Sequence, residues 1–491
     1  MYRDMTRGGI TRSLLLFALP MMAGSLLQQL YNVADTLIVG RALGRDALAA
    51  VGSAFTLMTF LTSVFLGLAM GAGALFSIYL GRKDMASLHR AAALALCLIG
   101  GVTAALTALV YVLLDPILRF LQVPDSLYGD MAGYLRIIFV GLAATFLYNF
   151  FACLLRSAGN SAAPLWFLGG AALLNVGLDL LFVLVLRWGV SGAAAATVIA
   201  QYAAGLGLTV YALLRCRDML PRRADFRFDR HILRELMDLS LLTCAQQSAM
   251  NFGILLVQRL VDSFGPVVMA AFAAAVKIDA FAYLPVQEFG NAFSTFAAQN
   301  YGAGQSDRLR QGLRQATAVS AAFSCAVAAL VVVFARPLMG LFVQAGDTEV
   351  IACGVRYLRI EGTFYAGIGC LFLLYGFYRA VQRPGMSVVL TVVSLGTRVA
   401  LAYALAGPVG EAGIWAAIPI GWFLADAAGY GYYLRHRKAL LTPRAQENEA
   451  HANGMRLVLL FAAYCSSAGM SRRSSAVTST LSLAGAAPGR R

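Results

Sequence analysis

Charged residues are scarce in this chain. They make up 13% of its 491 residues, whereas 59% are hydrophobic, and the mean hydropathy is +0.71. Because about a quarter of the residues in a soluble protein are charged, this composition excludes an ordinary soluble domain. Helices that face lipid must be apolar around most of their circumference and must satisfy their backbone hydrogen bonds internally. The sequence therefore predicts an all-α integral membrane protein.

The sequence also lacks the motifs of common enzymes. It contains no GxxxxGK[ST] phosphate-binding loop, no serine elbow and no HExxH motif. Without the phosphate-binding loop, direct use of ATP as the energy source is excluded. The eight cysteines show no CxxC or other metal-ligand spacing, so we expect small core residues and not a disulfide framework. We predict that the protein is not an enzyme and needs no cofactor, and that its polar residues suit Na⁺ as well as a proton.

The net charge of +15 raises the alternative of a nucleic-acid partner. The basic residues, however, are spread among short connections and are not interleaved with aromatic residues on one face. The positive-inside rule, which retains Lys and Arg in cytoplasmic loops, explains this excess better. The first apolar run, 13–39, is too long for a signal peptide and is expected to be the first span. We expect a monomer in the lipid bilayer of the bacterial cytoplasmic membrane, with both termini in the cytoplasm and no nucleic-acid partner.

Twelve apolar segments are long enough to cross a membrane, since a hydrocarbon core about 30 Å thick needs roughly 20 helical residues. They cover 13–39, 52–80, 93–118, 131–154, 163–186, 191–214, 236–261, 270–298, 316–343, 353–378, 387–406 and 413–434. The longest connection between them, 215–234, is strongly basic and divides the spans six and six.

The two sets of six spans share residues at a nearly constant offset. Gly81 is matched by Gly302 after 221 residues, and Arg156 is matched by Arg379 after 223 residues. Equal topology in both halves implies a parallel repeat about an axis along the membrane normal. The predicted domains are two six-helix lobes, 1–220 and 221–440.

The last part of the chain differs in composition. After about Thr442 it is rich in Ala, Ser, Gly, Arg and Glu, and its one apolar run, 457–465, is too short to span. We predict that residues 441–491 form a disordered cytoplasmic tail, with an interfacial helix as the alternative.

Two aspartates inside predicted spans are the strongest functional candidates, because an ionisable residue there costs a few kcal/mol and is functional by default. Asp35 lies about 6 Å below the outer end of the first span, and Asp179 about 10 Å below the outer end of the fifth. Asn175 lies one turn deeper than Asp179 on the same face. Thr197 reaches a similar depth from the sixth span, so all four side chains are expected in the outer half of the first lobe.

These four side chains offer hard oxygen ligands to a small cation. They are equally suited to a proton, because two carboxylates in a low dielectric repel each other and one of them is then readily protonated. A fixed hydrogen-bonded network is the structural alternative. The predicted coupling site, for Na⁺ or H⁺, consists of Asp35, Asn175, Asp179 and Thr197.

The second half carries a different polar set. Glu288 lies in the middle of a span, with Asn291 three residues later and Lys277 three turns earlier on nearly the same face. They line a wet cavity in one reading; in the other, Lys277 snorkels and Glu288 is a locked interhelical partner. Arg398 is expected to be structural. Aromatic residues can stack on flat or cationic substrates, and the predicted substrate cavity comprises Tyr31, Tyr148, Gln246, Asn251, Phe281, Glu288 and Asn291.

Several of these segments resemble the multidrug and toxic compound extrusion family. The resemblance rests on YNVADTLIVG, on NVGLDLLF followed by GVSGAAAAT, and above all on QNYGAGQSDRLRQG with its counterpart IYLGRKD, and it covers residues 12 to about 435. It implies two six-helix lobes around a V-shaped central cavity, and export driven by a Na⁺ or H⁺ gradient.

The resemblance also implies roles for particular residues. Asp35 and Asp179 match the family's two aspartates in the first lobe, and Asn175 and Thr197 match its asparagine and threonine. The acidic site of another branch, on spans seven and ten, is not matched. The expected function is an antiporter that exports amphipathic, often cationic organic compounds. A flippase for a lipid-linked saccharide is the alternative, although such flippases usually have a more basic cavity.

Overall fold

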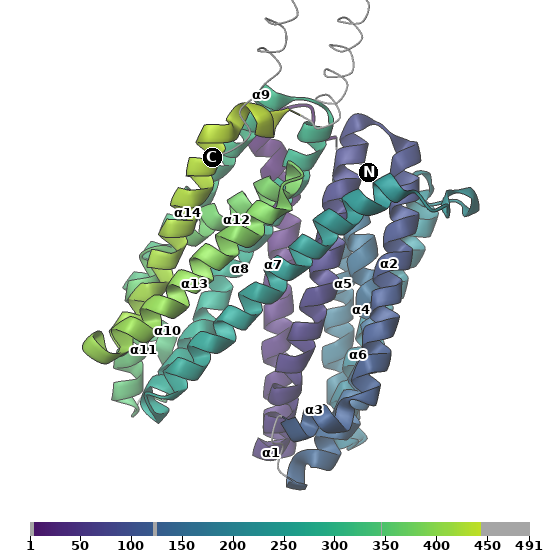
Figure 1. Ribbon diagram of the computed structural model, residues 1–491. Helices are drawn as coiled ribbons and strands as arrows, with labels where there is room; N and C mark the ends of the chain where they lie inside the picture. The colour runs from purple at the N-terminus through teal and green to yellow at the C-terminus, as the bar shows by residue number, and fades with distance from the viewer. Residues whose placement is uncertain (1–3, 121–124, 345, 443–491) are drawn as a thin grey trace, which may run out of the picture. The chain divides into compact units, whose positions relative to one another are not determined.

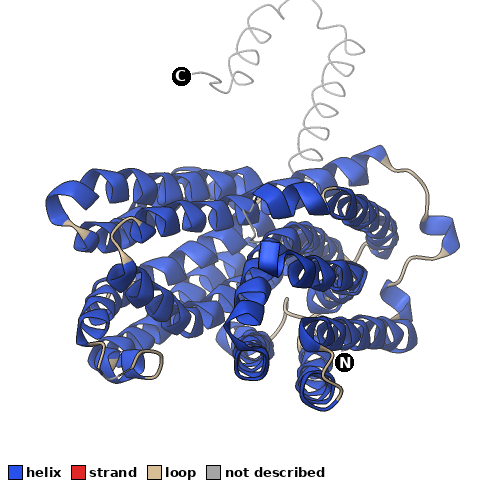
Figure 2. Cartoon of the chain, turned by 90° about the horizontal axis from the view of Figure 1, so that it is seen from below, coloured by secondary structure: helices blue, strands red, loops and turns tan. Residues whose placement is uncertain are grey.

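Nearly every residue that the structure describes lies in a helix. The computed structural model describes residues 4–120, 125–344 and 346–442, and this part of the chain contains no strand (Figure 2). The prediction of an all-α membrane protein is confirmed. The predicted tail lies almost wholly outside the described residues.

The helices follow one another with short connections (Figure 1). The first half contains α1 (Ile10–Arg82), α2 (Met85–Val112), α3 (Leu114–Phe120), α4 (Asp125–Ser157), α5 (Ala162–Asp179), the π-helix η1 (Leu180–Val185) and α6 (Gly189–Arg215). Two 3-10 turns follow, η2 (Arg217–Met219) and η3 (Arg223–Asp225). The second half contains α7 (Arg230–Asp262), α8 (Pro266–Gly302), α9 (Ser306–Val333), α10 (Ala335–Gly340), α11 (Thr348–Gly362), α12 (Tyr365–Ala380), α13 (Pro384–Val409) and α14 (Glu411–Leu441).

α1 holds two of the predicted spans. It is assigned as one helix of 73 residues, which would be about 110 Å long if it were straight. The segment just before its start and its last turn nevertheless lie near the same residue, because Met5 N donates to Gln299 Oε1 and Gly81 packs against the backbone oxygen of Gln299. The helix therefore folds back on itself between its two candidate spans, Ile10–Gly40 and Leu57–Arg82.

The spans can be counted from length and composition. Ten helical segments of the described part, two of them in α1, are long and apolar enough to cross a membrane, and the pair α11 and α12, bent by 52°, forms an eleventh span if it is counted as one. The remaining predicted span, 236–261, falls in α7. This helix has 33 residues, ample length for a span, but it is less apolar than the ten segments and is not counted among them. The twelve predicted spans thus correspond to these ten segments, the bent pair and α7.

α7 connects the two halves. Near its start, the Tyr79 hydroxyl donates to Glu235 Oε2 at 2.6 Å, and Arg90 pairs with Asp229 Oδ2 at 3.0 Å. Farther along, Gly253 packs on Leu395 of α13. Figure 1 shows α7 crossing from the side of α2 to the side of α13. The polar composition of α7 fits a helix that is packed against both halves.

The ends of α1 and α8 approach each other closely. A Cβ atom at Gly81 would overlap the backbone oxygen of Gln299, and a Cβ atom at Gly302 would overlap the backbone oxygen of Ile78. Small residues allow helix backbones to approach in this way. The two glycines that mark the repeat in the sequence therefore form a reciprocal crossing between the halves.

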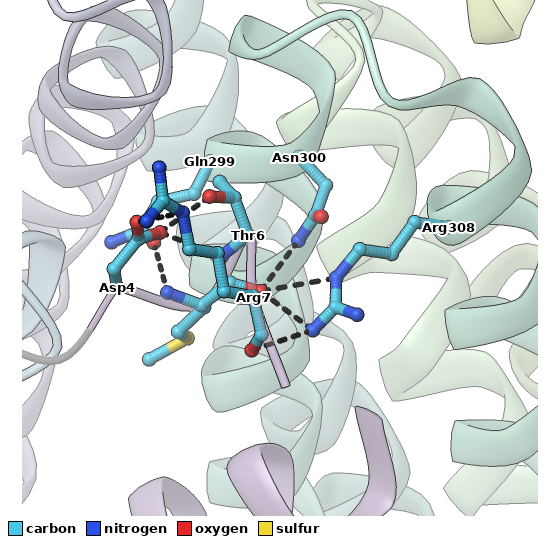
Figure 3. A network of polar contacts seen from close by, with 7 residues as sticks. Asp4, Thr6, Arg7, Gln299, Asn300 and Arg308 are labelled. Atoms are coloured by element: carbon cyan, nitrogen blue, oxygen red, sulfur yellow. Dashed lines mark hydrogen bonds and ion pairs between the residues drawn. The ribbon is translucent and has the colours of Figure 1, made fainter. Parts of the chain in front are cut away.

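The QNYGAG motif at the end of α8 holds the segment that precedes α1. Gln299 Oε1 accepts a hydrogen bond from Met5 N at 3.0 Å, and Asn300 Nδ2 donates to Met5 O at 3.3 Å (Figure 3). Arg308 Nη2 donates to the same oxygen at 3.1 Å and to Arg7 O at 3.0 Å. The Met5 side chain is fully buried at this junction.

Both ends of the described chain lie at this end of the bundle. Ser306 Oγ donates to Leu441 O at 2.8 Å, only a few residues after the motif that contacts Met5. The connection between α6 and α7 lies beside α2, since His89 Nε2 is 2.6 Å from Asp218 O. The segments that carry most of the basic connecting residues are thus gathered on one side of the protein.

Candidate functional site

The structure brings the four predicted coupling residues together. Asp35 of α1 lies beside Asp179 of α5, and Asn175 Nδ2 donates to Thr197 Oγ1 of α6 at 3.3 Å. Asn175 and Asp179 are fully buried, each with 0% exposure. Their i to i+4 spacing places them on one face of α5, as the sequence predicted.

Asp179 is the last residue of α5, and the π-helix η1 begins at the next residue. Short π-helical segments are rare and frequently occur at functional sites. No periodicity in the apolar sequence 180–185 signals this change of helix type.

The oxygens of this cluster are poorly satisfied. Asp35 Oδ1, both carboxylate oxygens of Asp179 and Asn175 Oδ1 are buried and have no hydrogen-bond partner within the described part of the chain. Burying such groups is costly unless a proton or a cation compensates them. Two carboxylates with neutral oxygens fit a small monovalent cation or a shared proton. Among the described residues, no group of three or more His, Cys, Asp or Glu side chains is arranged so that it could hold a metal ion.

Two tyrosines border the carboxylates. Tyr31 of α1 lies beside Asp35 and Thr197, and Tyr134 of α4 lies near Asp35 and Asp179. Tyr31 was predicted to line the substrate cavity, whereas the structure places it at the coupling residues. Tyr134 was not singled out, because its position in an apolar segment is typical of packing.

A second polar cluster lies where the halves meet. A cavity of about 50 Å³ is lined by Glu288 and Asn291 of α8, Arg379 of α12 and Arg156 of α4. Asn291 Nδ2 donates to Glu288 Oε1 at 3.2 Å, and Arg379 Nη2 donates to Asn291 Oδ1 at 3.1 Å. Arg379 Nε also donates to Ser294 Oγ at 3.2 Å. The two arginines that the repeat relates thus face one cavity.

The other predicted cavity residues lie elsewhere. Only Glu288 and Asn291 of the seven line this cavity. Tyr148 belongs to the first half, where its hydroxyl donates to Pro164 O at 3.2 Å. Lys277 is exposed, which agrees with the snorkelling interpretation. The remaining side chains are half-buried or buried in α7 and α8: Gln246, Asn251 and Phe281.

A third cluster, in the second half, was missed in the sequence. Asp279 of α8 accepts a hydrogen bond from the Tyr357 hydroxyl at 2.6 Å and another from the Tyr365 hydroxyl. Glu361 lies beside Asp279, and Arg398 lies near both carboxylates. A carboxylate within the predicted span 270–298 was the available signal for Asp279. Arg398, expected to be structural, is thus the cation that faces this acidic pair.

Known proteins resemble this chain in sequence and in fold. The family model described as MatE matches residues 20–181 and again residues 242–404. The probable multidrug resistance protein YpnP of Bacillus subtilis (strain 168) is 30% identical, and the match covers 88% of this chain and 96% of that protein. The FAD transporter of Shewanella oneidensis is 28% identical, with 87% and 95% covered. A solved structure of a MOP superfamily transporter from Pyrococcus furiosus has a TM-score of 0.84 at 23% identity, covering 89% of this chain and 98% of that one.

Proposed function

Because the chain belongs to the MatE family of multidrug and toxic compound extrusion transporters, we propose that it exports amphipathic, often cationic organic compounds in exchange for Na⁺ or H⁺. The protein is a multi-span membrane transporter and not an enzyme. The names of its relatives, a probable multidrug resistance protein and an FAD transporter, support small organic molecules as substrates. We place it in the bacterial cytoplasmic membrane as a monomer, with both termini in the cytoplasm.

The single observation that carries the coupling proposal is the buried pair of Asp35 and Asp179. The pair joins α1 to α5, and three of its four carboxylate oxygens are buried with no hydrogen-bond partner among the described residues. Binding of a cation or a proton would remove the repulsion between the carboxylates, and its release would restore it. A ligand shifts a conformational equilibrium only by its difference in affinity between the two states. The charge change at this contact supplies such a difference.

Neutral groups around the pair would complete the site. Asn175 Oδ1 is buried and has no hydrogen-bond partner in the described part, and Thr197 Oγ1 accepts from Asn175 Nδ2. These oxygens suit Na⁺, which prefers oxygen ligands, and they suit a proton on either aspartate equally well.

Export of soluble compounds is supported over flipping of a lipid-linked saccharide. The relatives described above carry names of drug and flavin-nucleotide transporters.

Transport by proteoliposomes, with Na⁺ and H⁺ gradients imposed separately, tests the proposal. Asp35→Asn and Asp179→Asn each remove a charge at nearly constant volume, so we expect folded protein that has lost gradient-driven export. The double variant should be scarcely worse than either single variant, because residues that act as a unit are not additive. Asp238→Asn, at an exposed position of α7, is the matched control and should transport normally.

If both single variants elute as folded protein and export a cationic dye at the parental rate under both gradients, the coupling site lies elsewhere in the chain.

A further inference from the structure

The cavity between the halves carries an excess of positive charge. Arg156 and Arg379 line it together with one carboxylate, that of Glu288. Ion pairs within 4.0 Å are present elsewhere in the described residues, but none of them joins Glu288 to either guanidinium. Glu288 Oε1 instead accepts from the neutral amide of Asn291. The two arginines are therefore not neutralised by direct contact with the one acid beside them.

Buried polar atoms without hydrogen-bond partners also indicate that the two arginines are not neutralised. Arg156 Nε and Glu288 Oε2 are buried, and neither has a hydrogen-bond partner in the part of the chain that the structure describes. Arg379 is 4% exposed and uses Nε and Nη2 on two neutral oxygens, those of Ser294 and Asn291. A buried guanidinium is costly unless an anion pairs with it. Guanidinium groups match carboxylate and phosphate oxygens in a planar, two-pronged geometry.

The size of the cavity limits what it holds. A water molecule needs roughly 10–15 Å³ of cavity volume. The cavity of about 50 Å³ therefore admits a carboxylate or phosphate head group but not a whole organic substrate. The body of a larger molecule would have to remain outside the cavity. Glu288 Oε2, on the same wall, would accept a hydrogen bond from an amine or hydroxyl of that molecule.

We propose that Arg156 and Arg379 form a binding site for the anionic group, a carboxylate or a phosphate, of the compounds that this transporter exports. The identity of the ligand as exported cargo rests on the proposed function. The inference refines the expectation of cationic substrates, because it favours compounds that carry an acidic group next to an aromatic or amine-bearing body. Arg156 belongs to the first half and Arg379 to the second, so the bound anion joins the two halves.

A pair of dyes that differ only in one carboxylate tests this site. A rhodamine with a free carboxylate and its methyl ester are titrated into the purified full-length protein in detergent, and binding is followed by fluorescence polarisation. The parent protein should bind the free acid at least about 10-fold more tightly than the ester, because charge-assisted hydrogen bonds are strong. Arg156→Gln and Arg379→Gln should remove this preference and leave binding of the ester unchanged.

Two further variants keep the test decisive. Arg336→Gln makes the same chemical change at an exposed position outside the cavity and should keep the preference. Glu288→Gln removes the competing carboxylate at constant shape, so affinity for the free acid should rise by several-fold. If the arginine variants do not fold, the Glu288→Gln variant still tests the proposal.

The proposal is overturned if the parent binds acid and ester equally, if folded arginine variants keep the preference, or if Glu288→Gln leaves acid binding unchanged or weaker. Because no gradient is present, this result is independent of ion coupling. If the parent protein does not prefer the free acid but still exports under a gradient, only the anion-site proposal is refuted. If it prefers the free acid but shows no gradient-driven export, only the coupling proposal is refuted.

Discussion

A carboxylate inside an apolar helix needs a partner that takes up its charge, and the buried acids of this protein differ in whether they have one. Asp279 accepts hydrogen bonds from the hydroxyls of Tyr357 and Tyr365. Neither carboxylate oxygen of Asp179 has a hydrogen-bond partner among the described residues. A satisfied carboxylate holds helices in one arrangement, whereas an unsatisfied one is able to take up and release an ion. We therefore assign a structural role to Asp279 and a coupling role to Asp179.

Tyr357→Phe tests the structural role. The change removes one hydroxyl donor and leaves an oxygen of Asp279 without it, so we expect a loss of about 1–3 kcal/mol in the free energy of unfolding. Thermal unfolding of the detergent-solubilised protein measures this loss as a lower Tm, and the ion dependence of transport should not change. Tyr403→Phe, at an exposed position of α13, is the matched control. An unchanged Tm together with altered ion dependence would instead assign Asp279 to coupling.

The residues of the proposed coupling site were named from the sequence on two grounds. Asn175 and Asp179 are one turn apart, and Asp35 lies at a similar depth in another span, so helix geometry placed them in the outer half of the first lobe. The family resemblance then implied that they form one site. The placement of Arg156, Arg379 and Glu288 around one cavity depends on the packing of helices that are distant in the chain. A single sequence gives no measure of such packing, and the arginine cavity was therefore not predicted.

Among the helices, the crossing of α1 and α8 turns a repeat in the sequence into a contact between the halves. Gly81 and Gly302 each lack the Cβ atom that would overlap the backbone of the other helix. The sequence predicted the pairing of these residues by offset, but it did not predict that they would lie at the same crossing. The π-helix η1 was likewise beyond hydropathy, which detects length and apolarity but not helix type, whereas the span in α7 was predicted at 236–261.

Gly81→Ala tests the crossing. An alanine normally stabilises a helix by about 1 kcal/mol relative to glycine, but here the added methyl group forces the backbones apart, at a cost of about 1–3 kcal/mol. We expect a lower Tm for Gly81→Ala and for Gly302→Ala. Gly101→Ala, in α2 with open space around the position, should leave the Tm unchanged or raise it. Equal Tm values for all three variants would show that the crossing relaxes without strain.

For the molecule as a whole, the distribution of charge and the position of the chain ends favour one orientation. The start of α1, the end of α14 and the basic connection before α7 lie at the same end of the bundle. Basic connecting residues are retained on the cytoplasmic side. The same end carries the close crossing of the halves, so a cytoplasmic orientation would place the tightest junction of the transporter on the side facing the cell interior.

Cysteine accessibility tests this orientation. Single reporters are introduced at Arg223, in the connection before α7, and at Glu349, near the start of α11, in a protein whose eight native cysteines are replaced by serine. Both positions are exposed, so reactivity toward a membrane-impermeant maleimide depends on the side of the membrane. In intact cells we expect labelling at Glu349 and none at Arg223 until the membrane is permeabilised. Labelling at Arg223 and not at Glu349 in intact cells would show the opposite topology. The Asp35 and Asp179 pair would then lie nearer the cytoplasmic face, and the coupling ion would have to bind from the inside.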